Sequence, residues 1–294
     1  MSDRHLKIDE KMAQLTPLKP GLYCVATPIG NLKDITIRAL ETLQQCDIIA
    51  CEDTRISRKL LAHYGISKPL WIYQDHNANA KRADILNAIR DGKSIALNSD
   101  AGTPLISDPG TKLVRACQED GLYITTLPGA SAVITALVLS GLMSHAFAFV
   151  GFCEPKHMHK WATFDGSLIF FESPRRLVQT LERMATTFQN RNVAVVREIT
   201  KLFEEVKGND FESVIAHYQA YPPKGEIVIV LGEAHIDTTP STEAIDDALI
   251  KALETLSIKD AAHMVATMFE LPKKEIYTRA LMIKEHIKSR ISKD

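Results

Sequence analysis

The chain has 294 residues with 45% hydrophobic and 24% charged side chains, and its 35 basic and 36 acidic residues give a formal net charge of -1. Its length suffices for two α/β domains, and its balanced charge excludes a protein that coats nucleic acid through a large overall positive charge. No apolar run is long enough to span a membrane and the first 20 residues lack the apolar core of a signal peptide, so we expect a cytoplasmic protein without membrane contact, with a flexible leader at 1–20.

The cysteines lie mostly in apolar runs and form no Cys-x-x-Cys pair: Cys24, Cys46, Cys51, Cys117 and Cys153. We expect reduced thiols, buried as small hydrophobic side chains, rather than disulfides or zinc ligands. His157 and His159 stand near Cys153 in a short connector, and we interpret them as exposed loop residues. No metal site is therefore predicted.

Short apolar runs alternate with helical patterns from residue 21 to residue 143, which we interpret as a first α/β domain. The runs predicted as strands lie at 22–26, 47–51, 94–97 and 123–127. The helical patterns lie at 35–43, 57–65, 78–90, 113–117 and beyond 132. Strands that alternate with helices indicate βαβ units on a mostly parallel sheet.

A second α/β domain is predicted over 144–235, and its connector at 151–166 is expected to be exposed. Ser173 and Pro174 suit the N-cap and the first position of a helix that runs to about residue 188. The predicted strands lie at 147–151, 167–171, 193–199, 203–207 and 227–231. Because fewer of these strands are separated by full helices, more of this sheet is predicted to be antiparallel.

The tail, 242–294, carries apolar side chains at helical spacing and is predicted to be all-helical. Pro272 separates a helix near 259–269 from one that starts at Lys273, a layout that resembles a helix-turn-helix. From Glu270 onward, seven basic residues stand against four acidic ones. We therefore expect the tail to add sequence-independent affinity for RNA.

Four loops rich in Gly, Pro and polar side chains follow predicted strands of the first domain: TPIGNL at 27–32, EDTR at 52–55, SDAGTP at 99–104 and PGASA at 128–132. Each alone could be structural, with Thr54 and Ser131 as helix caps. Because ligands of open α/β sheets bind beyond the carboxyl ends of the strands, the shared placement favours one ligand cleft. The glycine pattern of a nicotinamide site and the Walker A loop are both absent, which disfavours hydride transfer and nucleotide hydrolysis.

The loop SDAGTPLISDPG, at 99–110, contains two aspartates to which we assign different roles. Asp100 stands at the strand end and is a candidate for chemistry. Asp108 suits the N-cap of the following helix, with Pro109 at its first position. Since Asn caps a helix about as well as Asp, we expect Asp108→Asn to cost little activity.

Several segments resemble, in this order, the bacterial small-subunit ribosomal RNA 2'-O-ribose methyltransferases of the tetrapyrrole methylase superfamily: YCVATPIGNL, ACEDTR, DHN at 75–77, SDAGTPLISDPG, LPGASA, FFESPRRL, REITK and KGEIVIVLG. The match runs from Gly21 to about Gly232, and the tail resembles the C-terminal helix-turn-helix region of these enzymes. The resemblance implies a two-domain α/β fold of the tetrapyrrole-methylase type (class III methyltransferase) with a small all-helical C-terminal region.

The resemblance also implies a chemistry and its partners. The methyl donor would be S-adenosylmethionine, held between the two α/β domains of a homodimer. The acceptor would be a cytidine ribose 2'-hydroxyl in the decoding region of 16S rRNA, within the 30S subunit. Two alternatives remain open: a small-molecule methylase of the tetrapyrrole type in the same superfamily, and a non-catalytic RNA-binding module that would rest on the tail alone.

Carried over to this chain, the resemblance implies a cofactor site made of loop and strand-end residues: Pro28, Ile29, Gly30, Asn31, Ser99, Asp100, Ala101, Gly102, Thr103, Pro128, Gly129, Ala130, Ser131, Ala132, Phe170, Phe171, Gly225, Glu226 and Ile227. A base could help the hydroxyl proton leave, and the candidates are Glu52, Asp53 and His76, with Asp100 expected on the cofactor side. Basic residues expected to contact RNA are Arg55, Lys156, Lys160, Arg175, Arg176, Lys273 and Lys274.

Overall fold

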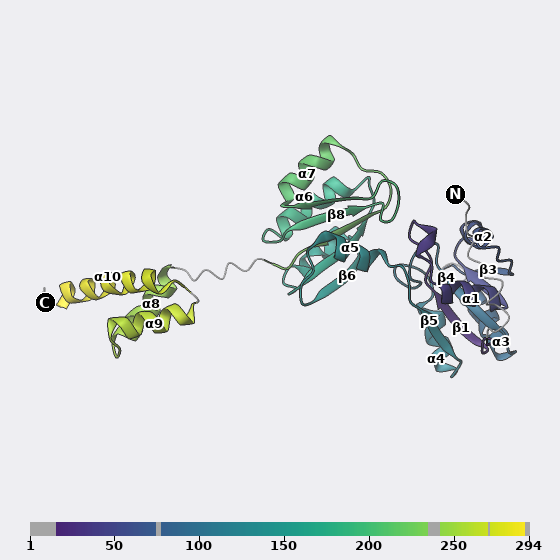
Figure 1. Ribbon diagram of the computed structural model, residues 1–294, viewed down its shortest axis with the longest axis horizontal. Coiled ribbons are helices and arrows are strands. Elements are labelled where there is room, and N and C mark those ends of the chain that lie inside the picture. The colour runs from purple at the N-terminus through teal and green to yellow at the C-terminus, as the bar shows by residue number, and fades with distance from the viewer. Residues whose placement is uncertain (1–15, 75–77, 235–241, 270, 292–294) are drawn as a thin grey trace, which may run out of the picture. The chain divides into compact units, whose positions relative to one another are not determined.

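The computed structural model describes residues 16–74, 78–234, 242–269 and 271–291. The chain divides into two compact units, Met1–Ala234 and His235–Asp294, and each is described by itself (Figure 1). Most of the predicted leader and the candidate base His76 lie outside the described residues. No described helix is long and apolar enough to cross a membrane.

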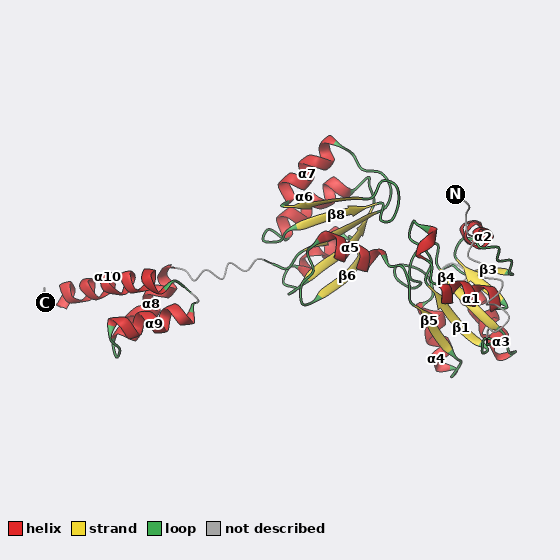
Figure 2. Ribbon diagram, in the orientation of Figure 1, coloured by secondary structure: helices red, strands yellow, loops and turns green. Residues whose placement is uncertain are grey.

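The first sheet is fully parallel, with the strand order β3-β2-β4-β1-β5 (Figure 2). Its strands are β1 (Gly21–Val25), β2 (Ile48–Cys51), β3 (Leu70–Ile72), β4 (Ser94–Asn98) and β5 (Ile124–Leu127). The central strands β1, β2 and β4 are buried along their whole length, as expected of a parallel sheet covered on both faces. The prediction of a parallel first sheet is confirmed.

Helices cover both faces of this sheet because side chains alternate along each strand. The helices are η2 (Leu32–Asp34), α1 (Ile37–Gln45), α2 (Thr54–His63), α3 (Ala78–Arg90) and α4 (Thr111–Glu119). Leu22 and Cys24 of β1 pack in one core with α3 and α4, whereas Tyr23 and Val25 pack in another with α1 and α2. All five cysteines are buried free thiols, as predicted.

The second sheet has the order β6-β7-β10-β8-β9, and only its β6–β7 pair is parallel. Its strands are β6 (Phe147–Phe152), β7 (Ser167–Glu172), β8 (Val193–Arg197), β9 (Glu205–Asn209) and β10 (Ile227–Leu231). Helices α6 (Leu177–Thr187) and α7 (Phe211–Ala220) pack on one face. The prediction of a more antiparallel second sheet is confirmed.

Helix α5 (Ala132–Ser140) follows β5 in the chain but packs on the other face of the second sheet. Its Val133, Ala136 and Leu137 share a core with Val228 and Val230 of β10. Ser131 caps the helix by accepting a hydrogen bond from the Ile134 amide, as the sequence predicts. This packing brings the PGASA loop, which ends the first sheet, against the second sheet.

Two local predictions in this unit are wrong. Asp108 does not cap α4: the helix begins at Thr111 with Gly110 as N-cap, and no side chain caps it. Ser173 does not cap α6, which begins at Leu177, because the Ser173 amide and hydroxyl both donate to the carboxylate of Glu172. The connector at 151–166 is mostly exposed, as predicted, but it contains the 3₁₀ helix η3 (Pro155–Trp161), whose Met158 is buried in the core beneath it.

The second unit contains α8 (Thr242–Leu253), α9 (Ile258–Met268) and α10 (Lys273–Ile291). Leu249, Ala261 and Val265 belong to a core of its own, and the Arg279 guanidinium forms an ion pair of 2.5 Å with Asp246. The predicted helix break at Pro272 is confirmed.

Candidate functional site

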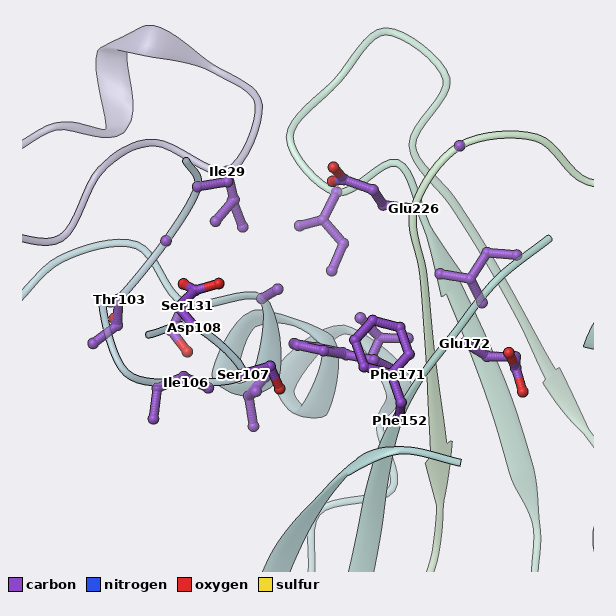
Figure 3. Close-up of a pocket in the computed structure, with 18 of the residues that line it drawn as sticks. Ile29, Thr103, Ile106, Ser107, Asp108, Ser131, Phe152, Phe171, Glu172 and Glu226 are labelled. Carbon is purple, nitrogen blue, oxygen red and sulfur yellow. The ribbon is translucent and has the colours of Figure 1, made fainter. Parts of the chain in front are cut away.

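A cavity of about 370 Å³ lies between the loops of the first sheet and the ends of β7 and β10, a size typical of small-molecule sites. Figure 3 shows Ile29, Thr103, Ser107 and Ser131 on one side, and Phe171 across from them. Ten of the predicted cofactor residues line it: Ile29, Ala101, Gly102, Thr103, Ser131, Ala132, Phe171, Gly225, Glu226 and Ile227. Sequence reasoning missed an equal number: Ile106, Ser107, Asp108, Val133, Phe152, Glu172, Ser173, Pro174, Ile199 and Val228.

Hydrogen bonds hold three of the predicted loops together at the cavity. The amides of Thr27 and Gly102 each donate to the carbonyl of the other, at 2.9 and 3.0 Å. The Thr103 hydroxyl donates to the Ala130 carbonyl at 3.1 Å. Gly102 has a φ of 79°, a conformation that glycine adopts without strain, and this turn exposes its backbone to the cavity. Three of the loops that are distant in the sequence therefore form one wall of the cavity.

The loop after β8 contacts the first loop of the first sheet and so joins the two α/β parts. The Asn31 amide donates to the Thr200 hydroxyl at 2.9 Å, and a Cβ on Gly30 would lie 2.6 Å from the same oxygen. Asn31 and Gly30 are not among the residues that line the cavity, and the structure uses them in this contact instead.

The turn before β10 depends on Glu198. Its carboxylate accepts hydrogen bonds from the Glu226 amide and from Lys201, both at 3.0 Å. Lys201 also contacts the Glu226 carboxylate at 3.0 Å. Gly225 has a φ of 86°, and a Cβ there would lie 2.2 Å from Glu198 Oε1. The turn can therefore hold Glu226 at the cavity only with a glycine beside it.

Asp53, a candidate base, is the N-cap of α2, so Thr54 is not. Its carboxylate accepts a hydrogen bond from the Arg55 amide at 2.7 Å and forms an ion pair of 2.6 Å with the Arg55 guanidinium, whose side chain is 84% exposed. These hydrogen bonds from Arg55 lower the pKa of Asp53 to about 2. A carboxylate this weakly basic is better suited to positioning than to removing a proton.

Asp108 is a cavity-lining carboxylate whose pKa is raised. It lines the cavity, and burial first, then the negative charge of Glu52, raises its pKa to about 6, against a hydrogen bond from Ser99. Asp100 lies in the same acidic group: its Oδ1 accepts a hydrogen bond from the Asp53 amide at 3.1 Å, and burial raises its pKa. Asp100 is not among the cavity-lining residues. The signal that could have identified Asp108 is the second aspartate in one glycine-rich loop.

Other predicted site residues have supporting positions. Phe170 is 1% exposed in the core with α6, because alternation along β7 turns only Phe171 toward the cavity. The cavity-lining residues do not include the predicted cofactor residues Pro28, Ser99, Pro128, Gly129 and Ala130. The Glu52 carbonyl accepts a hydrogen bond from the Gln74 side chain at 3.0 Å.

Of the residues predicted to contact RNA, most have exposed side chains: Arg55, Lys156, Lys160, Arg175, Lys273 and Lys274. Arg176 is engaged differently. Its guanidinium forms an ion pair of 2.8 Å with Glu172, whose side chain is fully buried and also accepts from the Thr180 hydroxyl at 2.6 Å. Arg176 therefore compensates a buried charge at the end of β7.

Comparisons with known proteins agree with this architecture. The family profile described as Tetrapyrrole (Corrin/Porphyrin) Methylases matches residues 21–214, and the profile described as RsmI C-terminal HTH domain matches residues 239–284. Among solved structures, cobalt precorrin-4 methyltransferase aligns with a TM-score of 0.57 at 16% identity, over 72% of this chain and 95% of that one. Uroporphyrin-III C-methyltransferase from Thermus thermophilus, in complex with S-adenyl homocysteine, aligns with a TM-score of 0.53 at 17% identity, over 72% and 97%. These likenesses confirm the predicted fold class.

Relatives found by sequence have a higher identity to this chain than these solved structures. Ribosomal RNA small subunit methyltransferase I of Erythrobacter litoralis is 50% identical over 91% of this chain and 97% of its own length. The protein of the same name from Mesorhizobium japonicum is 43% identical over 92% of this chain and 94% of its own. The chain belongs to the tetrapyrrole methylase family and, within it, to the ribosomal RNA small subunit methyltransferases I.

Proposed function

We propose that this protein transfers a methyl group from S-adenosylmethionine to a cytidine ribose 2'-hydroxyl in the decoding region of 16S rRNA. It acts in the cytoplasm on the 30S subunit, as a homodimer. The observation that carries the proposal is the cavity itself, where glycine-containing turns meet a half-buried carboxylate of raised pKa in a chain of this family. The names of the relatives support an RNA substrate.

The residues present fit the cofactor. Apolar side chains suited to an adenine ring line the cavity, among them Ile29, Phe171 and Ile199. Gly102 and Gly225 present backbone without a Cβ, which permits close approach of a ligand. Asp108 places negative charge in the wall, where it favours a cation. The cofactor, when bound, supplies a methyl group activated by a positively charged sulfur.

The chain's own part in the reaction is alignment and proton removal. The two walls hold the reactants in line, and such positioning can lower a barrier by ~7–11 kcal/mol. Asp108 would accept the proton of the ribose hydroxyl while the hydroxyl oxygen bonds to the methyl carbon and the methyl–sulfur bond breaks. Asp100 is a positioning residue, because its hydrogen bond to the Asp53 amide ties the EDTR loop to the cavity rim. The exposed side chain of Arg55, two residues after Asp53, would contact a phosphate of the target strand.

Label transfer tests the function directly. Purified protein with labelled S-adenosylmethionine is added to 30S subunits from a strain that lacks the enzyme, and the labelled nucleotide is mapped by mass spectrometry. We expect one 2'-O-methylated cytidine in 16S rRNA. Label in a tetrapyrrole and not in RNA would identify a small-molecule methylase, and label in neither would favour a non-catalytic RNA-binding module.

Gly225→Ala tests the turn that holds Glu226 at the cavity. A methyl group at this position would overlap the Glu198 carboxylate, so the turn must shift. We expect the affinity for S-adenosylmethionine, measured by calorimetry, to fall about tenfold, equivalent to about 1.4 kcal/mol.

Gly92→Ala is the matched control, because Gly92 has a similar φ of 90° but a Cβ added there would meet no atom within 4 Å. Both variants carry a backbone cost of roughly 1–2 kcal/mol, seen in thermal unfolding. Equal cofactor affinity in the two variants would contradict the proposed role of this turn.

A further inference from the structure

A second cavity, of about 420 Å³, lies in the same unit, and none of its lining residues lines the cavity described above. The end of β8, helix α7 and the turn that follows α7 form its walls. The residues that matter here are Arg197, Glu205, His217, Tyr218, Tyr221 and Lys224. The cavity is open at its rim, where the Tyr221 side chain is 70% exposed.

Two polar atoms in this cavity have no hydrogen-bond partner. Among the described residues only three buried side-chain atoms lack one, and two of them are the Tyr218 hydroxyl and Arg197 Nε. Tyr218 is 2% exposed, and a buried donor left unpaired costs free energy. The rest of the Arg197 guanidinium is engaged, with Glu205 at 2.5 Å and the Lys224 carbonyl at 3.3 Å. Two side chains that line the cavity thus each carry a buried donor for which the fold supplies no acceptor.

The acidic side chains of the cavity are already engaged by neighbouring groups. Glu205 contacts Arg197 and also His217, at 3.2 Å. Glu198 accepts from Lys201 and from the Glu226 amide. The ligand that fits the remaining donors is therefore rich in acceptors, with a negative charge near Lys224.

The rim is aromatic. The rings of Tyr221 and His217 lie 5.3 Å apart, tilted by 41°, and Phe203 beside them is 66% exposed. Exposed aromatic rings next to Lys and Arg are the combination on which unpaired nucleobases stack in RNA-binding proteins. A proline-rich peptide would also use aromatic rings, but it brings no negative charge to Lys224.

The position of the cavity connects it to the methyl-transfer site. Lys224 lines the second cavity, and the next two residues, Gly225 and Glu226, line the first. Glu198 lines the second cavity and holds Glu226 through the hydrogen bond to its amide. One turn therefore forms a wall of both cavities, so a strand that reaches one can continue to the other.

We propose that the second cavity binds an unpaired base of the RNA substrate, close in sequence to the methylated nucleotide. The base stacks on Tyr221, its polar edge accepts hydrogen bonds from Arg197 and Tyr218, and its phosphate contacts Lys224. This inference rests on the proposed function, because it requires RNA to be the substrate.

The test uses the full-length chain with three substitutions. Tyr221→Ala removes the stacking ring, Tyr218→Phe removes only the unpaired hydroxyl, and Leu202→Ala is a control at an apolar side chain that is 90% exposed and outside the cavity. The probe is a single-stranded RNA hexamer that contains 2-aminopurine, whose fluorescence falls when it stacks. Methylation of 30S subunits is measured in parallel.

For Tyr221→Ala we expect the dissociation constant of the hexamer to rise about 5- to 100-fold, with loss of the quenching. KM for 30S subunits rises, while kcat and the affinity for S-adenosylmethionine stay unchanged. Tyr218→Phe weakens RNA binding without lowering the unfolding temperature. If the hydroxyl were purely structural, its removal would instead lower the unfolding temperature. Leu202→Ala behaves as the wild type.

Two results would overturn the inference. The first is that Tyr221→Ala leaves the affinity for the hexamer and KM for 30S subunits unchanged. The second is that the wild type binds a proline-rich peptide but not the hexamer, and that Tyr221→Ala abolishes the binding of the peptide. Either can occur while the wild type still methylates 30S subunits, and the proposed function then stands. A wild type that methylates no RNA at all would overturn the proposed function itself.

Discussion

Replacement of Asp108 with Asn is expected to lower kcat for methylation of 30S subunits by about 10²- to 10⁴-fold, the usual contribution of a general base. Asn keeps the size of the side chain and its place in the cavity wall but cannot accept the hydroxyl proton. The affinity for S-adenosylmethionine, measured by calorimetry, should change little, since the rest of the wall is intact. Asp53→Asn is the comparison variant, because Asn still caps α2.

The pH dependence gives a second measurement of the same carboxylate. Because the pKa of Asp108 is raised to about 6, the wild-type rate should rise with pH through about 6 and then level off, and this limb should be absent in Asp108→Asn. A native-state pKa above the unfolded value means that ionisation of Asp108 destabilises the fold as the pH rises through about 6. The stability advantage of Asp108→Asn over the wild type should therefore be small near pH 3, grow as the pH rises from about 4 to about 6, and persist at pH 8.

A small effect on kcat would contradict the assignment of Asp108 as the base. If Asp53→Asn instead lost the activity, the base would be the cap of α2. If Asp108→Asn is more stable than the wild type at pH 8 and yet inactive, Asp108 is a functional residue, because the wild-type protein carries an ionised carboxylate there at a cost in stability.

Truncation after Ala234 is expected to weaken binding of 16S rRNA by about tenfold or more at low salt and to leave the affinity for S-adenosylmethionine unchanged. The removed unit has its own core and carries a cavity lined by Lys259, Lys273, Lys274 and Tyr277. Each lysine that contacts a phosphate adds roughly 0.7 to the slope of log affinity against log salt for single strands. Binding is measured by fluorescence anisotropy over a range of salt concentrations.

The double variant Lys273→Gln and Lys274→Gln in the full-length chain should lower the salt slope by roughly 1.4 if both contact phosphates. Lys251→Gln is its control, because Lys251 is exposed on α8 outside that cavity. Loss of RNA and cofactor binding to the same degree in the truncated protein would mean instead that the tail is needed for the fold of the first unit.

Sequence alone determined the elements whose signal is local or repeated. The alternation of short apolar runs with helical patterns correctly predicted the parallel sheet of the first half and the antiparallel one of the second. Pro272 marked the helix break in the tail, and Ser131 was correctly identified as the cap of α5. The order of several rare loop motifs indicated the family. These features depend on residues close together in the chain, so they can be recognised without the fold.

Only the tertiary structure decided the roles that depend on distant neighbours. Ser173 would cap a helix if the carboxylate of Glu172 did not bind it, and Phe170 and Phe171 differ only in which face of β7 they occupy. Asp108 has the local sequence of a helix cap, yet the loop turns it into the cavity, where burial and the charge of Glu52, 56 positions earlier in the chain, raise its pKa. Desolvation and the field of a remote charge are properties of the folded environment, and they turn a residue that looks structural into the candidate base.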